Sequence, residues 1–354
     1  SFGRSFYVFD DYSALRYVSE DQLKEEATLF PVRDEWWYIP RIVKGKLGGG
    51  NFMAANPPFG AVFTYYLSEG YKTDKTLRQE KEKTQLKNNE AVSFPGWEAV
   101  EAERRQAEPK VWLTVTDESG YVIRKIKGPA SKGFHRVAWD LRYSGTMAID
   151  VHDDNKNSWG FKAMAPPGTY TVAMSKEIDG VVTALSEPVT FTIKPLQKGA
   201  LEGSTPDRTV AFWREIQEVQ GHLSVTSIEL KHATKRVSSM QMALARTEKK
   251  LDDLNTELYQ LKQELFKIEV QMYGYKSKDE IGEENNPTVR SRLRAATSGV
   301  ENSTYGPTPT HKRSLELAKK EYQSLQQELD VIVNEKIPAI EKQLKEAGAP
   351  EIKG

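Results

Sequence analysis

A long apolar repeat between Ile216 and Met272 constrains the fold of this chain more than any other feature. Large apolar residues recur from Ile216 to Leu244 at alternating steps of three and four, with Thr226 filling the one gap, and from Leu251 to Met272 they continue in the same phase. This spacing is the a/d seam by which helices bury a narrow apolar stripe against one another. Thr205 and Pro206 provide a helix start, as N-cap and first helical residue. The positions of the repeat are Ile216, Val219, Leu223, Leu230, Ala233, Val237, Met240, Leu244, Leu251, Leu254, Leu258, Leu261, Leu265, Ile268 and Met272.

The repeat permits two arrangements. One is a single rod of about 60 residues, roughly 90 Å long at 1.5 Å per residue. The other is a hairpin folded near 245–247, where no Gly or Pro forces a turn. We also expect a short helix at 287–296 and a last one over 310–347, kinked at Pro338. Because an isolated rod would expose its seam, we predict a long helical hairpin within a three-helix antiparallel bundle over 205–347.

Residues 57–197 carry short β-type runs separated by turn residues, such as Asp117 to Gly120. This pattern predicts an antiparallel, immunoglobulin-like β-sandwich. The stretch 72–108, dense in Lys, Glu and Gln, reads as a solvated insertion with a helix near 97–106. The expected fold class is therefore α+β and multidomain. The expected strands lie at 61–67, 111–115, 121–126, 134–141, 169–174, 181–185 and 189–193.

Residues 1–56 are aromatic and irregular. Short β-type runs occur at Phe6–Phe9 and at Trp36–Ile39, and Gly48-Gly49-Gly50 reads as a flexible turn. Trp36 and Trp37 are adjacent, so in a strand they must point to opposite sides.

Charge and cysteine content exclude several classes of function. The chain has 50 Lys and Arg against 50 Asp and Glu, which gives no electrostatic reason to expect nucleic acid or an anionic membrane as a partner. No apolar run approaches the roughly 20 residues of a membrane span. The absence of cysteine excludes disulfides, zinc–cysteine sites and thiol chemistry.

Motifs that carry chemistry are scarce. The five histidines form no HExxH spacing, and neither a GxSxG elbow nor a P-loop is present. Asp150, Asp153 and Asp154, with His152 and Asn155, could offer oxygen ligands to calcium. The glycine and terminal glutamate of an EF-hand are missing there, so a solvated loop is the favoured interpretation. We assign no catalytic or cofactor-binding residue, and no cofactor.

The seven tryptophans allow two interpretations. A carbohydrate-stacking platform is one. The other places Trp112 and Trp139, which lie in strand patterns, in the hydrophobic core, and we favour it. The remaining tryptophans are Trp36, Trp37, Trp97, Trp159 and Trp213.

Several segments together resemble the C-terminal portion of large bacterial β-propeller proteins, classed as glycosyl hydrolases with neuraminidase-type repeats or as sortilin-like. Residues 2–11 look like the closing strand of that propeller, and 56–67 like the first strand of the immunoglobulin-like domain that follows. Residues 116–120, 133–142 and 165–172 resemble the same domain, in an order also found in flagellar hook-capping-type sandwiches. The helical tail, closing on 347–350, is similar to the family's C-terminus. One departure is that relatives often have extra loop residues between the first two long helices, whereas the repeat here is unbroken.

The resemblance implies that residues 1–56 are the end of a propeller and a linker, with Ser1 a cut inside the last propeller strand. Any activity would then reside on blades that this sequence does not contain, and no family catalytic residue falls within it. The Ser-x-Asp-x-Gly-x-x-Trp box of sialidase-type propellers is also absent. The implied location is secreted, periplasmic or on the outer surface of a Gram-negative bacterium.

The expected role is that of a non-catalytic accessory or scaffolding region of a secreted or cell-surface protein. It would brace the parent propeller and contact a protein partner, or a second copy, through the helical arm. The alternative is a carbohydrate-binding or substrate-orienting appendage of a sialidase-like glycoside hydrolase.

Overall fold

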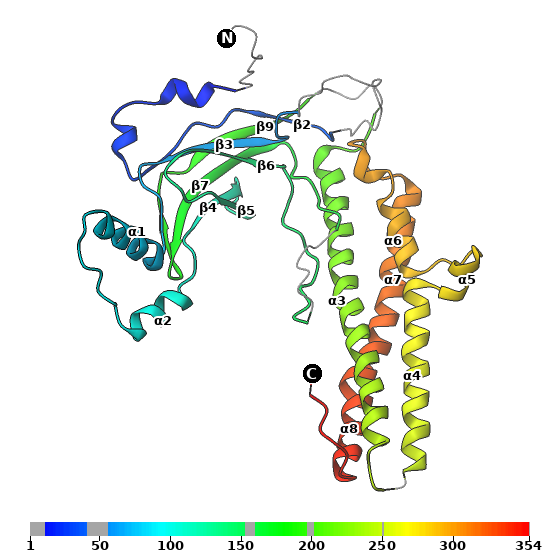
Figure 1. Cartoon of the computed structure of the whole chain (residues 1–354). Coiled ribbons are helices and arrows are strands. Elements are labelled where there is room, and N and C mark those ends of the chain that lie inside the picture. The colour runs from blue at the N-terminus through cyan, green and yellow to red at the C-terminus, as the bar shows by residue number, and fades with distance from the viewer. Residues whose placement is uncertain (1–10, 41–55, 153–159, 197–201, 250, 354) are drawn as a thin grey trace, which may run out of the picture. The chain divides into compact units, whose positions relative to one another are not determined.

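The computed structural model describes residues 11–40, 56–152, 160–196, 202–249 and 251–353. The fold is mixed α and β, with the strands gathered in the first half and the long helices in the second (Figure 1). The chain divides into two compact units. The sheet unit comprises residues 1–144 and 164–198, and the helical unit comprises 145–163 and 199–354.

The sheet unit contains two sheets. One has the order β1 (Ala27–Leu29), β3 (Ala61–Leu67), β6 (Gly133–Trp139), all antiparallel. The other has the order β2-β9-β7-β4-β5, with β8 (Val181–Ala184) also paired to β7. Its strands are β2 (Glu35–Trp37), β9 (Val189–Pro195), β7 (Gly168–Ile178), β4 (Lys110–Asp117) and β5 (Val122–Gly128). All of its pairings are antiparallel except that of β2 with β9, which is parallel.

Alternation along the strands builds the core of this unit. Ala61, Phe63, Tyr65 and Leu67 of β3 are fully buried, and the residues between them are half-buried. This is the period of two that places one face of a strand inside. Aromatic rings join the two sheets. The Phe63 ring lies 5.7 Å from that of Phe191 on β9, and the Trp139 ring of β6 lies 5.5 Å from that of Tyr170 on β7.

The insertion between β3 and β4 forms two helices, α1 (Asp74–Lys87) and α2 (Trp97–Arg105). Neither has a buried residue. The guanidinium of Arg78 on α1 bonds to Glu103 on α2 at 2.7 Å and to Glu82 on α1 at 2.6 Å. The Asp74 N–H also donates to the side chain of Gln106, at the end of α2, at 2.7 Å, so the two helices are joined by polar contacts rather than by an apolar seam.

The apolar repeat forms two helices and not one rod. They are α3 (Pro206–Leu244) and α4 (Asp252–Tyr273), and α4 runs back along α3 (Figure 1). All of the repeat is buried except Leu244 and Leu251, which flank the turn and are half-buried. Thr226, in the gap of the repeat, is also buried, and its hydroxyl contacts Tyr322 and Gln326 on α7.

The remaining helices complete this unit. They are α5 (Lys276–Ile281), α6 (Val289–Thr297), α7 (Pro309–Val331) and α8 (Ile337–Glu346). A π-helical turn, Ile332–Lys336, lies between α7 and α8, directly before Pro338. The regular helical ladder is thus interrupted close to Pro338, which cannot donate a backbone hydrogen bond, and the kink expected at this residue stays a prediction.

Residues 145–163 belong to the helical unit, although they lie between strands β6 and β7 and inside the range that the sequence analysis assigns to the sandwich. Side chains of α3 hold this segment. Gln217 accepts from the N–H of Ala163 at 3.0 Å, and Ser224 accepts from the N–H of Ala148 at 2.7 Å. Gly221 makes the approach possible, because a Cβ there would lie 2.8 Å from the carbonyl oxygen of Thr146.

Some expectations fall outside the described residues. They concern the strand expected at Phe6–Phe9, residues 2–10 of the stretch that resembles a propeller strand, and the glycine turn at 48–50. Asp153, Asp154 and Trp159 also lie outside the described residues.

Candidate functional site

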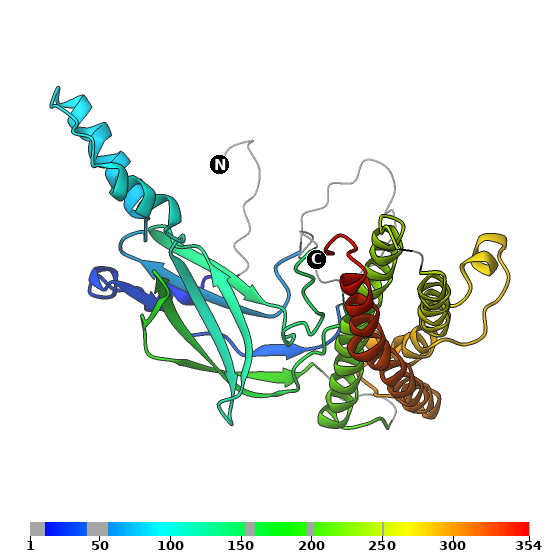
Figure 2. The same cartoon turned by 90° about the horizontal axis from the view of Figure 1, so that it is seen from below.

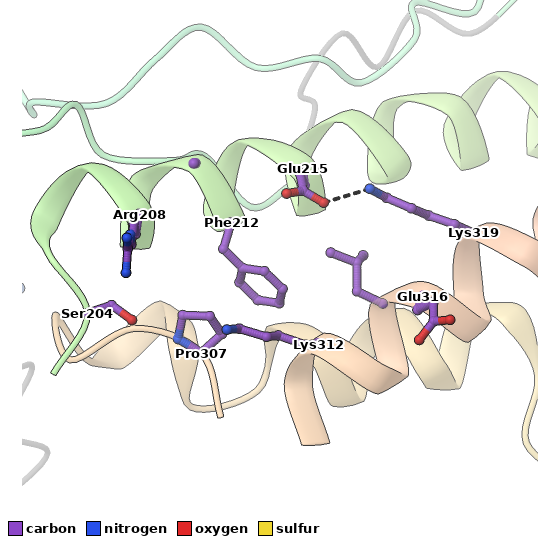
Figure 3. A pocket seen from close by; sticks show the side chains of 10 residues that line it. Ser204, Arg208, Phe212, Glu215, Pro307, Lys312, Glu316 and Lys319 are labelled. Atoms are coloured by element: carbon purple, nitrogen blue, oxygen red, sulfur yellow. Dashed lines mark hydrogen bonds and ion pairs between the residues drawn. The ribbon is translucent and has the colours of Figure 1, made fainter. Parts of the chain in front are cut away.

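A groove of about 500 Å³ lies between the first turns of α3 and α7 (Figure 3). Both helices begin there for local reasons. The hydroxyl of Thr205 caps α3, and the hydroxyl of Thr308 caps α7, with Pro206 and Pro309 at the first helical positions. The N–H of Ser204 donates to the carbonyl of Tyr305 at 2.9 Å, which holds the two helix starts side by side.

The groove has an apolar floor. The ring of Phe212 projects from α3 toward α7 (Figure 3), and Leu315 of α7 also lines the groove. Both side chains are largely buried. Pro307 and Ala211 extend this apolar surface. The floor therefore suits an aliphatic or aromatic group of limited size.

The rim of the groove carries unbalanced charge. The carboxylate of Glu215 pairs with Lys319 at 2.7 Å, and that of Glu316 pairs with Arg313 at 2.9 Å. Arg208 and Lys312 also line the groove, and in the described part of the chain neither has a carboxylate within ion-pair distance. The helix starts add partial positive charge through their backbone N–H groups. The groove is therefore suited to a carboxylate or another anionic group beside an apolar one.

The sequence analysis does not identify Arg208 or Lys312 as candidate site residues, although their positions carry a signal. Arg208 is the third residue of α3 and Lys312 the fourth of α7. Cations at those positions oppose the helix dipole, and acidic residues are favoured there. A cation in the first turn of two helices is thus a local conflict that can indicate a binding role.

A second groove, of about 740 Å³, lies in the same unit between the 145–163 segment, α3, α6 and the end of α4. Arg290 lies over the ring of Tyr273, 5.4 Å from its centroid, and the Tyr273 hydroxyl bonds to Ser227. Met147 and Phe161 line it from the segment.

The structure gives Asp150 charged partners within the chain. Its carboxylate accepts from the N–H of His152 at 2.9 Å and lies 3.4 Å from Lys231 Nζ and 3.3 Å from His232 Nε2. The backbone bond lowers the pKa of Asp150, and the neighbouring Lys231 lowers it further. Asp153 and Asp154 lie outside the described residues, and within those residues no group of three or more His, Asp or Glu is placed to hold a metal ion.

The tryptophans occupy different environments. Trp139 is buried in the core of the sheet unit, as predicted. The prediction for Trp112 is wrong, because Val111, Leu113 and Val115 take the inward face of β4. Trp112 is half-buried on the other face, where its indole N–H donates to Glu177 at 2.7 Å. Trp36 is exposed and Trp37 buried, which confirms that they point to opposite sides.

Trp97 is 79% exposed, and its ring lies 4.9 Å from that of Phe94. Trp213 is buried, and its indole N–H donates to the carbonyl of Val300.

The histidines do not form one site. His222 stacks on Tyr322, and His311 completes the capping box of α7. His135 bonds to the carbonyl of Ser131. Only His152 and His232 lie together, with ring centroids 5.0 Å apart.

In comparisons with protein-family models, with curated proteins and with solved structures, the chain has no significant match. Among the helices of the described ranges, none combines the length and apolar character needed to cross a bilayer.

Proposed function

We propose that this chain is a non-catalytic interaction module, in which an immunoglobulin-like sandwich is joined to an antiparallel helical bundle that binds an acidic segment of a protein partner. The groove between α3 and α7 is the observation that supports the proposal. It combines an apolar floor with Arg208 and Lys312, whose charges no described carboxylate neutralises.

The chemistry of the groove defines the partner segment. A side chain such as Leu or Phe fits against Phe212 and Leu315, and carboxylates beside it pair with Arg208 and Lys312. A polypeptide supplies both groups at once when acidic and apolar residues alternate. Because the two cations stand at a solvent-exposed rim, the affinity should fall as the salt concentration rises.

The resemblance to propeller proteins extends this proposal to the parent protein. In that setting the sandwich braces a propeller of a secreted or cell-surface protein of a Gram-negative bacterium, and the helical arm reaches the partner. The coding sequence upstream of Ser1 tests this part. Aspartate-box repeats there would support it, and an unrelated domain would contradict it.

Selection from a displayed random peptide library tests the groove itself. We expect the immobilised chain to select peptides with one large apolar residue flanked by Asp or Glu. The double variant Arg208→Glu/Lys312→Glu should weaken their binding at least about tenfold. Lys320→Glu is the matched control, because it makes the same charge change on α7 at an exposed residue that does not line the groove.

Two results would contradict the proposal. One is a set of selected peptides without acidic residues. The other is a Kd that stays the same in the double variant and in the control.

Carbohydrate binding is the second candidate, and the exposed pair Phe94 and Trp97 favours it. An aromatic face open to solvent is the group that stacks on a sugar ring, and Trp97 is the most exposed described tryptophan. Titration of tryptophan fluorescence with a panel of saccharides tests it. A response that disappears in Trp97→Ala but persists in Trp36→Ala would support this function, and no response to any saccharide would exclude it.

A further inference from the structure

The outer face of α4 carries a second apolar stripe, separate from the buried seam. Tyr259 and Phe266 are 60% and 50% exposed. They lie seven residues apart, which places them on one line along the helix, and Val270 lies one turn beyond Phe266 on the same side. Leu258, Leu261 and the other seam residues of α4 are buried on its opposite side. In Figures 1 and 2, α4 stands at the outside of the helical unit.

Two opposite charges flank this stripe. Lys262 and Glu269 are exposed and seven residues apart, so they lie on the same side of the line through Tyr259 and Phe266. Within the described residues neither has an ion-pair partner, whereas Glu264 on the same helix is paired with Lys336 at 2.6 Å. The stripe therefore offers apolar surface with one free cation and one free anion at a fixed spacing.

We propose that a second copy of this chain packs antiparallel on the outer face of α4. A two-fold axis across the helix between residues 265 and 266 brings Phe266 of the two copies together. The same axis places Lys262 of each copy level with Glu269 of the other, on the same flank. Tyr259 then lies opposite Val270, at both ends of the contact.

Self-complementarity is the reason for choosing a second copy as the occupant. A two-fold interface uses one patch twice, so its charges must match their own image. Antiparallel pairing gives two Lys262–Glu269 pairs, whereas parallel pairing in register puts these residues of the two copies on opposite flanks and forms neither pair. The chain's formal net charge of zero at pH 7 adds no overall repulsion between copies. Because one helix face is small, the dimer is weak and depends on protein concentration.

This inference rests on the interaction role proposed above and names a partner for a different surface. Sedimentation equilibrium of the full chain over a concentration series measures the dimer. We expect Phe266→Glu to raise its Kd at least about tenfold, because the variant places two carboxylates at the centre of the contact. Val331→Glu on α7, where the replaced side chain is 42% exposed, is the matched control and should leave the Kd unchanged.

Charge reversal identifies the register. Lys262→Glu and Glu269→Lys should each weaken the dimer, and the double variant Lys262→Glu/Glu269→Lys should restore it. Circular dichroism checks that these surface variants keep their helix content.

A chain that stays monomeric at all concentrations would overturn the inference, as would a dimer indifferent to Phe266→Glu or not restored by the double reversal. The peptide selection at the α3–α7 groove is read independently, so failure of the groove proposal and failure of the dimer are distinguishable.

Discussion

Glu35, the first residue of β2, titrates far from its ordinary range. Burial, aided by the nearby carboxylates of Asp11 and Asp34 and opposed by Arg33, raises the pKa of Glu35 to about 7. The folded chain thus binds this proton more tightly than the unfolded chain, in which the pKa is near 4.5. The contribution of this tighter proton binding to the free energy of unfolding is therefore full below pH 4.5, and it is lost as the pH rises through about 7.

We therefore expect Glu35→Gln to stabilise the sheet unit above pH 7 relative to the wild type, and to change it little near pH 4.5. A shift of this size corresponds to at most ~3 kcal/mol, which the half-exposed side chain reduces to ~1 kcal/mol. Urea unfolding at a series of pH values measures the difference. Glu118→Gln, at an exposed turn residue, is the control, and parallel pH curves for wild type and Glu35→Gln would contradict the prediction.

We predict that replacing Gly221 changes the stability of the helical unit in the direction opposite to the one that helix propensity gives. Replacing a glycine inside a helix by alanine ordinarily stabilises it by about 1 kcal/mol. Here the new Cβ would lie 2.8 Å from the Thr146 carbonyl oxygen, so either the segment 145–163 or α3 must shift. We expect Gly221→Ala to destabilise the helical unit by about 1–2 kcal/mol. Lys235→Ala, at an exposed position of α3, is the control, and a rise in Tm for Gly221→Ala would disprove the close approach.

At the scale of elements, the helices α1 and α2 depend on Arg78. Its bonds to Glu103 raise the pKa of Arg78, as do those to Glu82, and the same contact lowers the pKa of Glu103. Since neither helix buries a side chain, loss of this link should release α2 without changing the global Tm. We expect Arg78→Gln to speed hydrogen exchange over residues 97–105. Arg104→Gln is the control, because it removes an ion pair within α2 alone and should leave the exchange rate unchanged. Equal exchange rates over 97–105 in the two variants would contradict this account.

The long helices show which elements a sequence can specify. Periodicity alone predicts most of the buried positions from Ile216 to Met272, because the seam follows from helix geometry, but it does not predict the buried Gln217, Gly221 and Ala243. The turn between α3 and α4 lies where the hairpin alternative puts it, near 245–247, but the sequence leaves a continuous rod equally open. It contains neither Gly nor Pro, and α3 ends at Leu244, whose carbonyl accepts from the Thr247 hydroxyl at 3.1 Å. That end is decided by the packing of α4 on α3, which is a tertiary effect.

Short strands, in contrast, are elements that the sequence pattern does not specify. β1, Ala27–Leu29, was not expected, since three residues carry no alternation and its pairing with β3 spans about 40 positions of sequence. Trp112 was misplaced for a related reason. A strand with large apolar residues on both faces does not reveal which face is inward until the neighbouring strands are known.

At the scale of the whole molecule, residues 145–163 are a strand-to-strand connection in sequence and part of the helical unit in space. Their partners on α3 lie 54–76 positions away, as in the bonds from Ala163 to Gln217 and from Ala148 to Ser224. No local pattern reports such a contact. The one available signal was Gly221, a glycine inside a strongly helical stretch, which often marks a close backbone approach.

This assignment predicts that the helical unit cannot be excised intact by one cut. A fragment of residues 199–354 would lack the segment 145–163 and leave the side chains of Gln217 and Ser224 without the N–H donors they accept from. It should unfold at a lower urea concentration than the helical unit within the full chain. A synthetic peptide of residues 145–163 should then raise that midpoint, because a ligand that binds only the folded state stabilises it.

A peptide of the same composition in scrambled order is the matched control. The Gly221→Ala fragment should respond less than the wild-type fragment, because its added methyl group occupies the place of Thr146. If the fragment already unfolds at the midpoint of the full chain's helical unit, and the peptide adds nothing, residues 145–163 do not stabilise the helices. The segment would then be only a connection between strands β6 and β7.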